Sequence, residues 1–207
     1  MTTFDLIIIG GGAGAFAAAI KANELGAKTA LINDGLPLGG TCVNVGCVPS
    51  KTLLHAAELL HTARHHNVPG IEFAINRADF VAVVTDEIAL VERLREKKYE
   101  QVLRDLSNVT FIKGRAAFVS ERKVKVGEQE LEADKFIIAT GSTAIVPQVE
   151  GLVEADYITH IEAMSLKTVP NRLAVIGAGA VGLELAQMYS RFGSQVTILQ
   201  RATNIMP

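Results

Sequence analysis

Two cysteines lie five positions apart in the segment Gly39–Lys51, which reads GGTCVNVGCVPSK. Cys42 and Cys47 are the only cysteines in the 207-residue chain, so they cannot build a disulfide-rich scaffold. Pro49 is typical of a first helical turn, and the positive end of a helix beginning there would favour the thiolate form of nearby cysteines. The pair is interpreted as a redox dithiol. Two structural thiols, or half of a zinc site that no second cysteine pair completes, are the alternatives.

A glycine-rich loop precedes the cysteines. Gly10, Gly12 and Ala15 follow the apolar run 4–9, which predicts a buried strand, and open the alanine-rich stretch 16–25, which predicts a helix. Glycine permits the tight turn and lets the backbone approach a pyrophosphate at the helix N-terminus. An ordinary strand–turn–helix would share this pattern. The position of the loop in a complete βαβ unit favours dinucleotide binding.

A second glycine loop follows the run Arg172–Ile176, which also predicts a strand. Its glycines are Gly177, Gly179 and Gly182, and a helix through Phe192 and a strand at 195–199 complete another βαβ unit. Because a Rossmann sheet needs more than two strands, we expect this unit to be the beginning of a domain in a longer protein.

The residues after the second strand of each unit bear on cofactor choice. Asn33, followed by Asp34, stands where an acidic residue would hold ribose hydroxyls, and its amide can both accept and donate hydrogen bonds there. In the second unit Gln200 and Arg201 occupy this place, and an arginine there accommodates the phosphate of NADPH. A solvated surface arginine is the alternative to this NADPH preference.

The other elements complete an α/β fold, a parallel sheet with helices and a small antiparallel meander. We expect helices at 48–66 and 77–105, strands at 109–118, 123–126, 130–132 and 135–139, and a linker at 147–169. The net charge of −2 excludes a strongly basic nucleic-acid binder. The uncharged run Leu6–Ile20 is shorter than the roughly 18 residues of a membrane span, and Asp5 argues against a signal peptide. The default expectation is a soluble cytoplasmic protein.

The segment GGTCVNVGCVPSK resembles the active-site segment of the FAD-dependent pyridine nucleotide-disulfide oxidoreductases. The resemblance covers the whole chain, because Ala139–Gly141 and the second glycine motif follow in the family's order. It implies that Cys47 is the flavin-proximal thiol, in charge-transfer contact with FAD, and that Cys42 exchanges with the substrate. It further implies that Lys51 pairs with Glu184 beside the flavin, and that NADPH is the electron donor.

The resemblance also implies domains and a set of site residues. Residues 1–148 would form the FAD-binding domain and 149–207 the beginning of the NAD(P)H-binding domain, and the full-length protein would be a homodimer. The catalytic set is Cys42, Cys47, Lys51 and Glu184. The cofactor-binding set is Gly10, Gly12, Gly14, Ala15, Asn33, Asp34, Gly40, Thr41, Lys51, Ala116, Thr140, Gly141, Gly177, Gly179, Gly182, Glu184 and Arg201.

Within the family, VNVGCVPSK followed by Thr52–Leu54 is most similar to the mercuric reductases. Soft metal ions prefer sulfur ligands, so Cys42 and Cys47 would bind Hg(II) transiently as the substrate that is reduced to Hg(0). Two alternatives remain open. One is an NAD-linked dihydrolipoamide dehydrogenase, and the other is a flavin-binding fragment that is inactive on its own.

Overall fold

The computed structural model describes residues 2–206, and the chain divides into two units. Unit one contains the residues up to 44 together with 91–143, and unit two contains 45–90 and the residues from 144 onward. The long helical segments after residue 45 therefore group with the second βαβ unit. The expected domain boundary between residues 148 and 149 stays a prediction.

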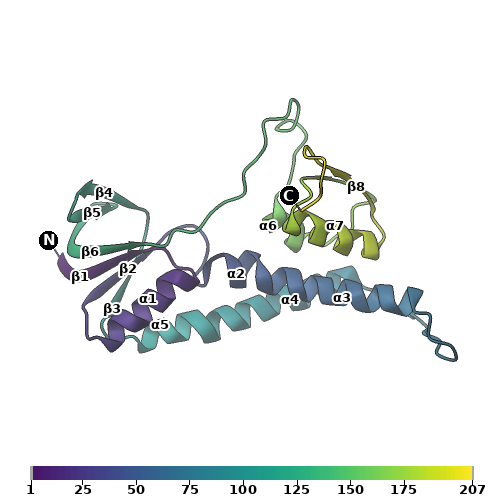
Figure 1. Cartoon of the computed structure of the whole chain (residues 1–207). Helices are drawn as coiled ribbons and strands as arrows, with labels where there is room; N and C mark the ends of the chain where they lie inside the picture. The colour runs from purple at the N-terminus through teal and green to yellow at the C-terminus, as the bar shows by residue number, and fades with distance from the viewer. Residues whose placement is uncertain (1, 207) are drawn as a thin grey trace. The chain divides into compact units, whose positions relative to one another are not determined.

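Unit one is built on a six-stranded sheet of order β3-β2-β1-β6-β5-β4. Strands β3, β2, β1 and β6 run parallel, and β6, β5 and β4 form an antiparallel meander at one side, as Figure 1 shows. The predicted α/β fold and its meander are thus confirmed. The bounds are β1 Thr2–Ile9, β2 Thr29–Asn33, β3 Val109–Lys113, β4 Ala116–Ser120, β5 Lys123–Val126 and β6 Gln129–Ile138.

Two of the predicted strands have different limits in the structure. The run expected at 109–118 is two strands, because the chain turns at Gly114, which has a φ of +147°. A side chain at Gly114 would also lie 2.6 Å from Val126. The runs expected at 130–132 and 135–139 instead form one strand, β6, in which residues 129–132 pair with β5 and residues 131–138 pair with β1.

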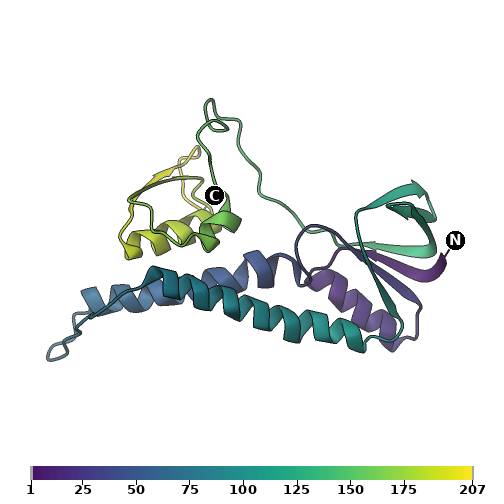
Figure 2. The same cartoon turned by 180° about the vertical axis from the view of Figure 1, so that it is seen from behind.

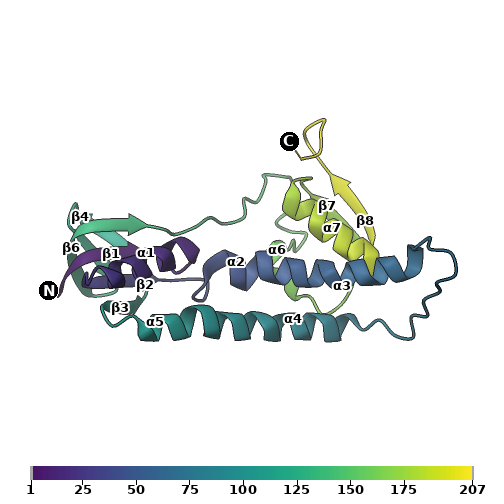
Figure 3. The ribbon, with the colours of Figure 1, turned by 60° about the horizontal axis from the view of Figure 1, so that its bottom comes forward.

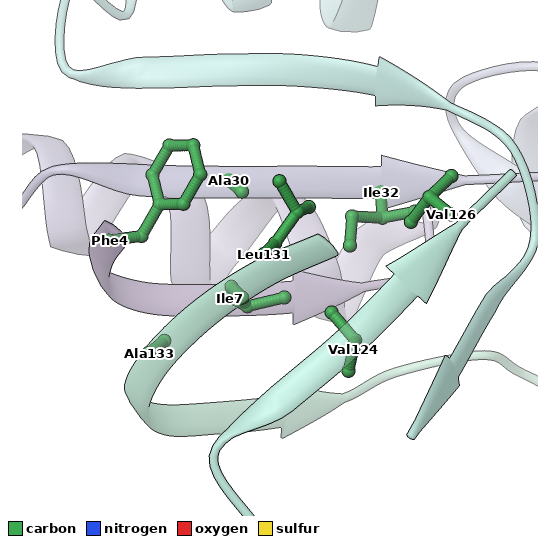
Figure 4. Close-up of a cluster of buried hydrophobic side chains, with 8 residues drawn as sticks. All are labelled: Phe4, Ile7, Ala30, Ile32, Val124, Val126, Leu131 and Ala133. Atoms are coloured by element: carbon green, nitrogen blue, oxygen red, sulfur yellow. The ribbon is translucent and has the colours of Figure 1, made fainter. Parts of the chain in front are cut away.

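The central strands β1 and β2 have buried residues on both faces, which explains their continuous apolar runs. Ile7 and Ile32 point to the face covered by the meander, where the buried cluster of Figure 4 lies. Ile8 and Leu31 point to the other face, against helix α1 (Ala13–Glu24). The cluster in Figure 4 consists of Phe4, Ile7, Ala30, Ile32, Val124, Val126, Leu131 and Ala133.

The helix expected at 77–105 begins later and is not uniform. Helix α4 spans Phe80–Arg95, a π-helical turn spans Glu96–Glu100, and α5 spans Gln101–Asp105, forming one continuous rod in Figure 2. Asp79 Oδ1 accepts a hydrogen bond from the Ala82 N–H at 3.1 Å, which fixes the start of α4. Hydrophobic periodicity carries no signal for a π-turn, so the sequence predicted a plain helix.

Unit two contains the second βαβ unit and the helices packed on it. Strands β7 (Arg172–Ile176) and β8 (Gln195–Leu199) are parallel, and α7 (Ala180–Phe192) connects them, as predicted. Helix α7 packs along α3 (Cys47–His65), which Figure 3 shows. Their contact is apolar and buries Leu53, Ala57, Leu185, Met188 and Tyr189.

A short helix interrupts the segment that was expected to be a linker. Helix α6 spans His160–Ser165 and starts with a capping box formed by Thr159 and Glu162. Its Ala163 carbonyl accepts a hydrogen bond from the buried Tyr189 hydroxyl, which ties α6 to α7. Among residues 2–206, no helix is both long and apolar enough to cross a membrane.

The buried face of α4 includes one acidic residue, Glu87, whose side chain is only 3% exposed. Burial raises the pKa of the Glu87 carboxyl from 4.5 to about 7. The folded chain therefore binds this proton more tightly than the unfolded chain does. The contribution of Glu87 to stability should therefore be complete below pH 4.5, decrease as the pH rises to about 7, and then level off.

We predict that Glu87→Gln removes this decline and makes the chain more stable above pH 7, by at most ~3 kcal/mol. Denaturant unfolding of the chain at several pH values between 5 and 8 measures the effect. Asp86→Asn is the matched control, because Asp86 is exposed on the same helix and its substitution should leave the decline in place. An identical pH dependence in wild type and Glu87→Gln would contradict the prediction.

Candidate active site

The first glycine loop lies at the carboxyl end of the parallel strands of unit one, the edge where open α/β sheets bind ligands. Gly10 ends β1 with a φ of +130°, and its N–H donates to the Ile32 carbonyl at 2.7 Å. A Cβ atom on Gly10 would lie 2.1 Å from the Ala139 carbonyl oxygen. Only glycine therefore fits between the ends of β1 and β6.

A second glycine pair approaches the same loop from the segment before the cysteines. Gly39 donates its N–H to the Gly11 carbonyl at 2.8 Å and forms a β-bridge with Gly12. A Cβ on Gly40 would lie 2.7 Å from the Gly12 Cα. Gly12 is also the N-cap of α1, and no side chain caps this helix. Gly12 is half-buried, and the uncapped helix start at this residue suits a bound phosphate group.

The other predicted residues of the first motif have distinct positions. Ala15 is fully buried and allows close packing of α1 on the sheet, as expected of the third position, and Gly14 lies in the first turn of α1. The Asn33 amide donates to the Leu36 carbonyl at 2.9 Å and lies against Gly11. Asp34 is exposed. The structure thus brings Asn33 to the glycine loop through local hydrogen bonding.

The residues after β6 also reach this edge. The Ala139 N–H donates to the Ile9 carbonyl at 2.8 Å, which places Thr140 and then Gly141 directly after the strand end beside Gly10. Ala116 has a different environment, because it begins β4 and packs against the buried cluster of Figure 4. Ala116 is thus a predicted cofactor contact that also packs against the core.

Helices carry both thiols. Cys42 lies in α2 (Gly40–Val45), a short helix that the sequence did not predict, next to the exposed Thr41. Cys47 is the first residue of α3, one position earlier than the predicted helix start. Both residues are thiols with exposed side chains. Cys47 therefore lies at the positive end of a 19-residue helix, as predicted from the position of Pro49.

A charged pair lies one helical turn beyond Cys47. Lys51 follows Cys47 by four residues in α3, so both lie on the same face of the helix. The Lys51 ammonium forms an ion pair with the carboxylate of Glu184 in α7, and the side chains are 60% and 39% exposed. The pairing that the resemblance implied is thus present within unit two.

The second glycine loop repeats the construction of the first. The Gly177 N–H donates to the Leu199 carbonyl at 2.9 Å, and Gly177 has a φ of +108°. A Cβ on Gly182 would lie 2.2 Å from the Gly177 carbonyl oxygen, so helix α7 can approach β7 only with glycine at this position. Gly179 is the N-cap of α7, again without a side-chain cap.

The end of β8 shows a contact that the sequence did not reveal. The Gln200 amide oxygen accepts from the Ala178 N–H at 3.2 Å, and its nitrogen donates to the Asn204 carbonyl at 3.3 Å. Gln200 is therefore occupied in tying the 200–204 segment to the glycine loop. Arg201 next to it is exposed. Of these two residues, Arg201 is the better placed to meet a ligand.

These features define an α/β unit with a glycine loop, followed by two helices that each carry one thiol and by a second glycine loop. The family model for pyridine nucleotide-disulphide oxidoreductases matches residues 4–207. The chain belongs to this family. Enzymes of the family use FAD and NAD(P)H.

Known relatives agree with this assignment. The mercuric reductase of Lysinibacillus sphaericus is 43% identical over 203 residues, and that of Serratia marcescens is 44% identical over 208 residues. The alignments cover 98% and 96% of this chain but 37% and 44% of those relatives. This chain thus spans about two fifths of their length.

Solved structures show the same fold. The HOCl-induced flavoprotein disulfide reductase RclA of Escherichia coli matches with a TM-score of 0.84 and 31% identity over 98% of this chain and 43% of that protein. The Cu(II) complex of RclA matches equally well.

The structure separates two roles that a glycine can have in this loop. Gly12 has a φ of −89°, and a Cβ there would meet only the Gly40 Cα, at 3.7 Å. The protein itself therefore tolerates alanine at position 12, whereas a pyrophosphate approaching the backbone would not. We predict that Gly12→Ala leaves the unfolding midpoint nearly unchanged and lowers FAD affinity at least about tenfold.

Flavin absorbance per purified holoenzyme, together with thermal unfolding, measures both effects. Ala17→Ser is the control, because Ala17 is exposed in the same helix, α1, and belongs to neither predicted site. This control should keep its flavin and lose less than about 1 kcal/mol in stability. Full flavin content in Gly12→Ala would refute the prediction.

Proposed function

We propose that this chain supplies the FAD-binding unit, the redox dithiol and the beginning of the NADPH-binding unit of a flavoprotein that reduces Hg(II) to Hg(0). The observation that carries the proposal is the Lys51–Glu184 ion pair one helical turn from Cys47. A dithiol at a helix N-terminus next to a positioned cation is suited to thiolate chemistry. The family and the mercuric reductase relatives support the reaction class.

The cofactor sites are assigned from the two glycine loops. Gly12 would hold the pyrophosphate of FAD at the uncapped start of α1, and the close backbone contacts of Gly10 and Gly40 would position the loop for it. Gly179, the uncapped start of α7, would hold that of NADPH together with Gly177. When bound, FAD supplies a two-electron relay between the nicotinamide and the sulfur pair.

The chain's own residues would handle sulfur and charge. Cys42 would bind and exchange the substrate, and Cys47 would complete the dithiol. Lys51 would hold a positive charge where electron density increases on reduction, and Glu184 would keep the ammonium in place. Overall, NADPH loses two electrons and releases one proton as NADP⁺ forms, and mercuric ion gains both electrons as Hg(0). The holoenzyme is proposed to be a cytoplasmic homodimer.

The substrate assignment follows from ligand preference. Two thiolates form a soft donor set, which favours mercuric ion over hard cations. The Cu(II) complex of RclA makes cupric ion the second candidate, since that flavoprotein shares the fold and 31% of the residues. An NAD-linked dihydrolipoamide dehydrogenase is the third, because its dithiol chemistry would use the same pair.

The test measures NADPH oxidation by the holoenzyme with Hg(II), with Cu(II), or with no metal, each in excess low-molecular-weight thiol. We expect Hg(II) to accelerate the reaction and one Hg(0) to form per NADPH consumed. Cys42→Ser and Cys47→Ser should each abolish the acceleration. Acceleration by Cu(II) alone would favour the second candidate, and NAD⁺ reduction by dihydrolipoamide without a mercuric response would favour the third.

The preference for NADPH is assigned to Arg201. A guanidinium can bind the 2′-phosphate with charge-assisted hydrogen bonds, each contributing about 1.5–3 kcal/mol. We predict that Arg201→Glu lowers kcat/KM for NADPH by roughly tenfold or more and changes that for NADH much less. Arg172→Glu is the control, because Arg172 is exposed at the opposite end of the β7–β8 pair. Equal losses for both nucleotides would show that Arg201 only supports the fold.

A further inference from the structure

The side-chain amide of Asn44 contacts the backbone of the segment that precedes Cys42. Its nitrogen is within hydrogen-bond distance of three carbonyl oxygens, those of Pro37 at 3.0 Å, Leu38 at 3.1 Å and Gly40 at 2.9 Å. The side chain is half-buried. The two N–H groups of this amide are thus shared among three backbone acceptors in residues 37–40, which we call the glycine turn.

The other end of the same amide meets a cation. Asn44 Oδ1 accepts from Arg95 Nη1 at 3.3 Å. Arg95 is the last residue of α4, and its Nε lies 3.4 Å from a carboxylate oxygen of Glu100 at the end of the π-turn. These contacts fix the amide orientation, because a flipped amide would place its oxygen against three carbonyls and its nitrogen against a guanidinium.

The glycine turn connects the cofactor loop to the thiol. Gly39 and Gly40 have φ values of +98° and +59°, and both contact the backbone of the first glycine loop. Gly40 is also the first residue of α2, which carries Cys42. Helix α2 has six residues, far fewer than an isolated helix needs for stability, so tertiary contacts must fix its position.

We propose that Asn44 is a positioning residue for the Cys42 thiol, which holds α2 on the glycine turn while the sulfur is oxidised and reduced. Arg95 acts through Asn44 by fixing its amide. The proposal rests on the proposed function, because it assigns Asn44 a part in the same dithiol cycle. It extends that function by linking the position of the thiol to the rod formed by α4 and the π-turn.

Replacement by aspartate is the sharpest test of this role. Asn44→Asp keeps the shape and the acceptor that faces Arg95, but it replaces the donor with a second oxygen against three carbonyls. Asn23→Asp is the matched control in the same unit. Asn23 Oδ1 accepts from the Asn108 N–H at 2.9 Å, and aspartate retains this acceptor.

The 207-residue chain, without flavin, nicotinamide or metal, is equilibrated with reduced and oxidised glutathione. Cys42 and Cys47 lose two protons and two electrons as their sulfur–sulfur bond forms, and one oxidised glutathione takes them up as two thiols. Alkylation and mass spectrometry give the fraction of disulfide. We expect Asn44→Asp to lower the equilibrium constant for disulfide formation about tenfold. This corresponds to a shift of about 30 mV in the reduction potential of the two-electron couple. Asn23→Asp should leave it unchanged.

A second variant separates positioning from folding. Arg95→Met leaves the three carbonyl bonds available but releases the amide oxygen, and we expect a decrease of a few fold in the same direction. Thermal unfolding of the reduced chain is recorded for each variant. If Asn44→Asp does not fold, the disulfide equilibrium of Arg95→Met tests the positioning role of Asn44. A wild-type disulfide equilibrium that neither variant changes would overturn the role of Asn44 alone. Failure of the wild-type chain to form the disulfide would overturn the proposed function as well.

Discussion

Close contact between backbones at glycine positions is the constraint on which both nucleotide loops depend. Gly10 lies against the end of β6, Gly40 lies against Gly12, and Gly182 lies against Gly177, and in each case a Cβ atom would come within 2.7 Å of the neighbouring backbone. These contacts bring strand ends, helix starts and the segment before the thiols to one edge of each sheet. Glycine costs conformational entropy on folding, so the buried strands behind these loops must supply the compensating stability.

The βαβ units could be predicted because each combines a short apolar run, a glycine loop and a helix-forming stretch in a fixed order, and in the first unit β1 and β2 are buried on both faces. Ile7 and Ile8 show this best, because these neighbouring residues of β1 are buried in two clusters on opposite faces of the sheet. The π-turn and α6 could not be predicted in the same way. A π-turn leaves the apolar pattern almost unchanged, and α6 is a single capped turn held by the Tyr189 hydroxyl.

Some residues of the candidate site could be predicted from the sequence, and others are identified only by their contacts in the structure. The glycines, the cysteines and Lys51 could be found from residue type and spacing, because each chemical role admits few residue types. Asn44 and Gln200 could not, since an asparagine or glutamine in a loop has many ordinary uses and only the atoms it contacts reveal its role. Asn44 donates to a turn 4–7 residues earlier, and Gln200 accepts from a loop 22 residues earlier. Such bonds depend on how the chain folds back, which local pattern does not specify.

The energetics of unit two favour a chemical role for Lys51 and Glu184 over a structural one. An ion pair whose side chains are 60% and 39% exposed contributes about 0–1 kcal/mol to stability. Each fully buried apolar side chain between α3 and α7, such as Leu53 or Met188, contributes about 1.5–3 kcal/mol. Apolar packing therefore holds the two helices together, and the helices in turn set the distance between the charges. A cation held in this way keeps its place one turn from Cys47 whatever the charge on the sulfur, as the proposed chemistry requires.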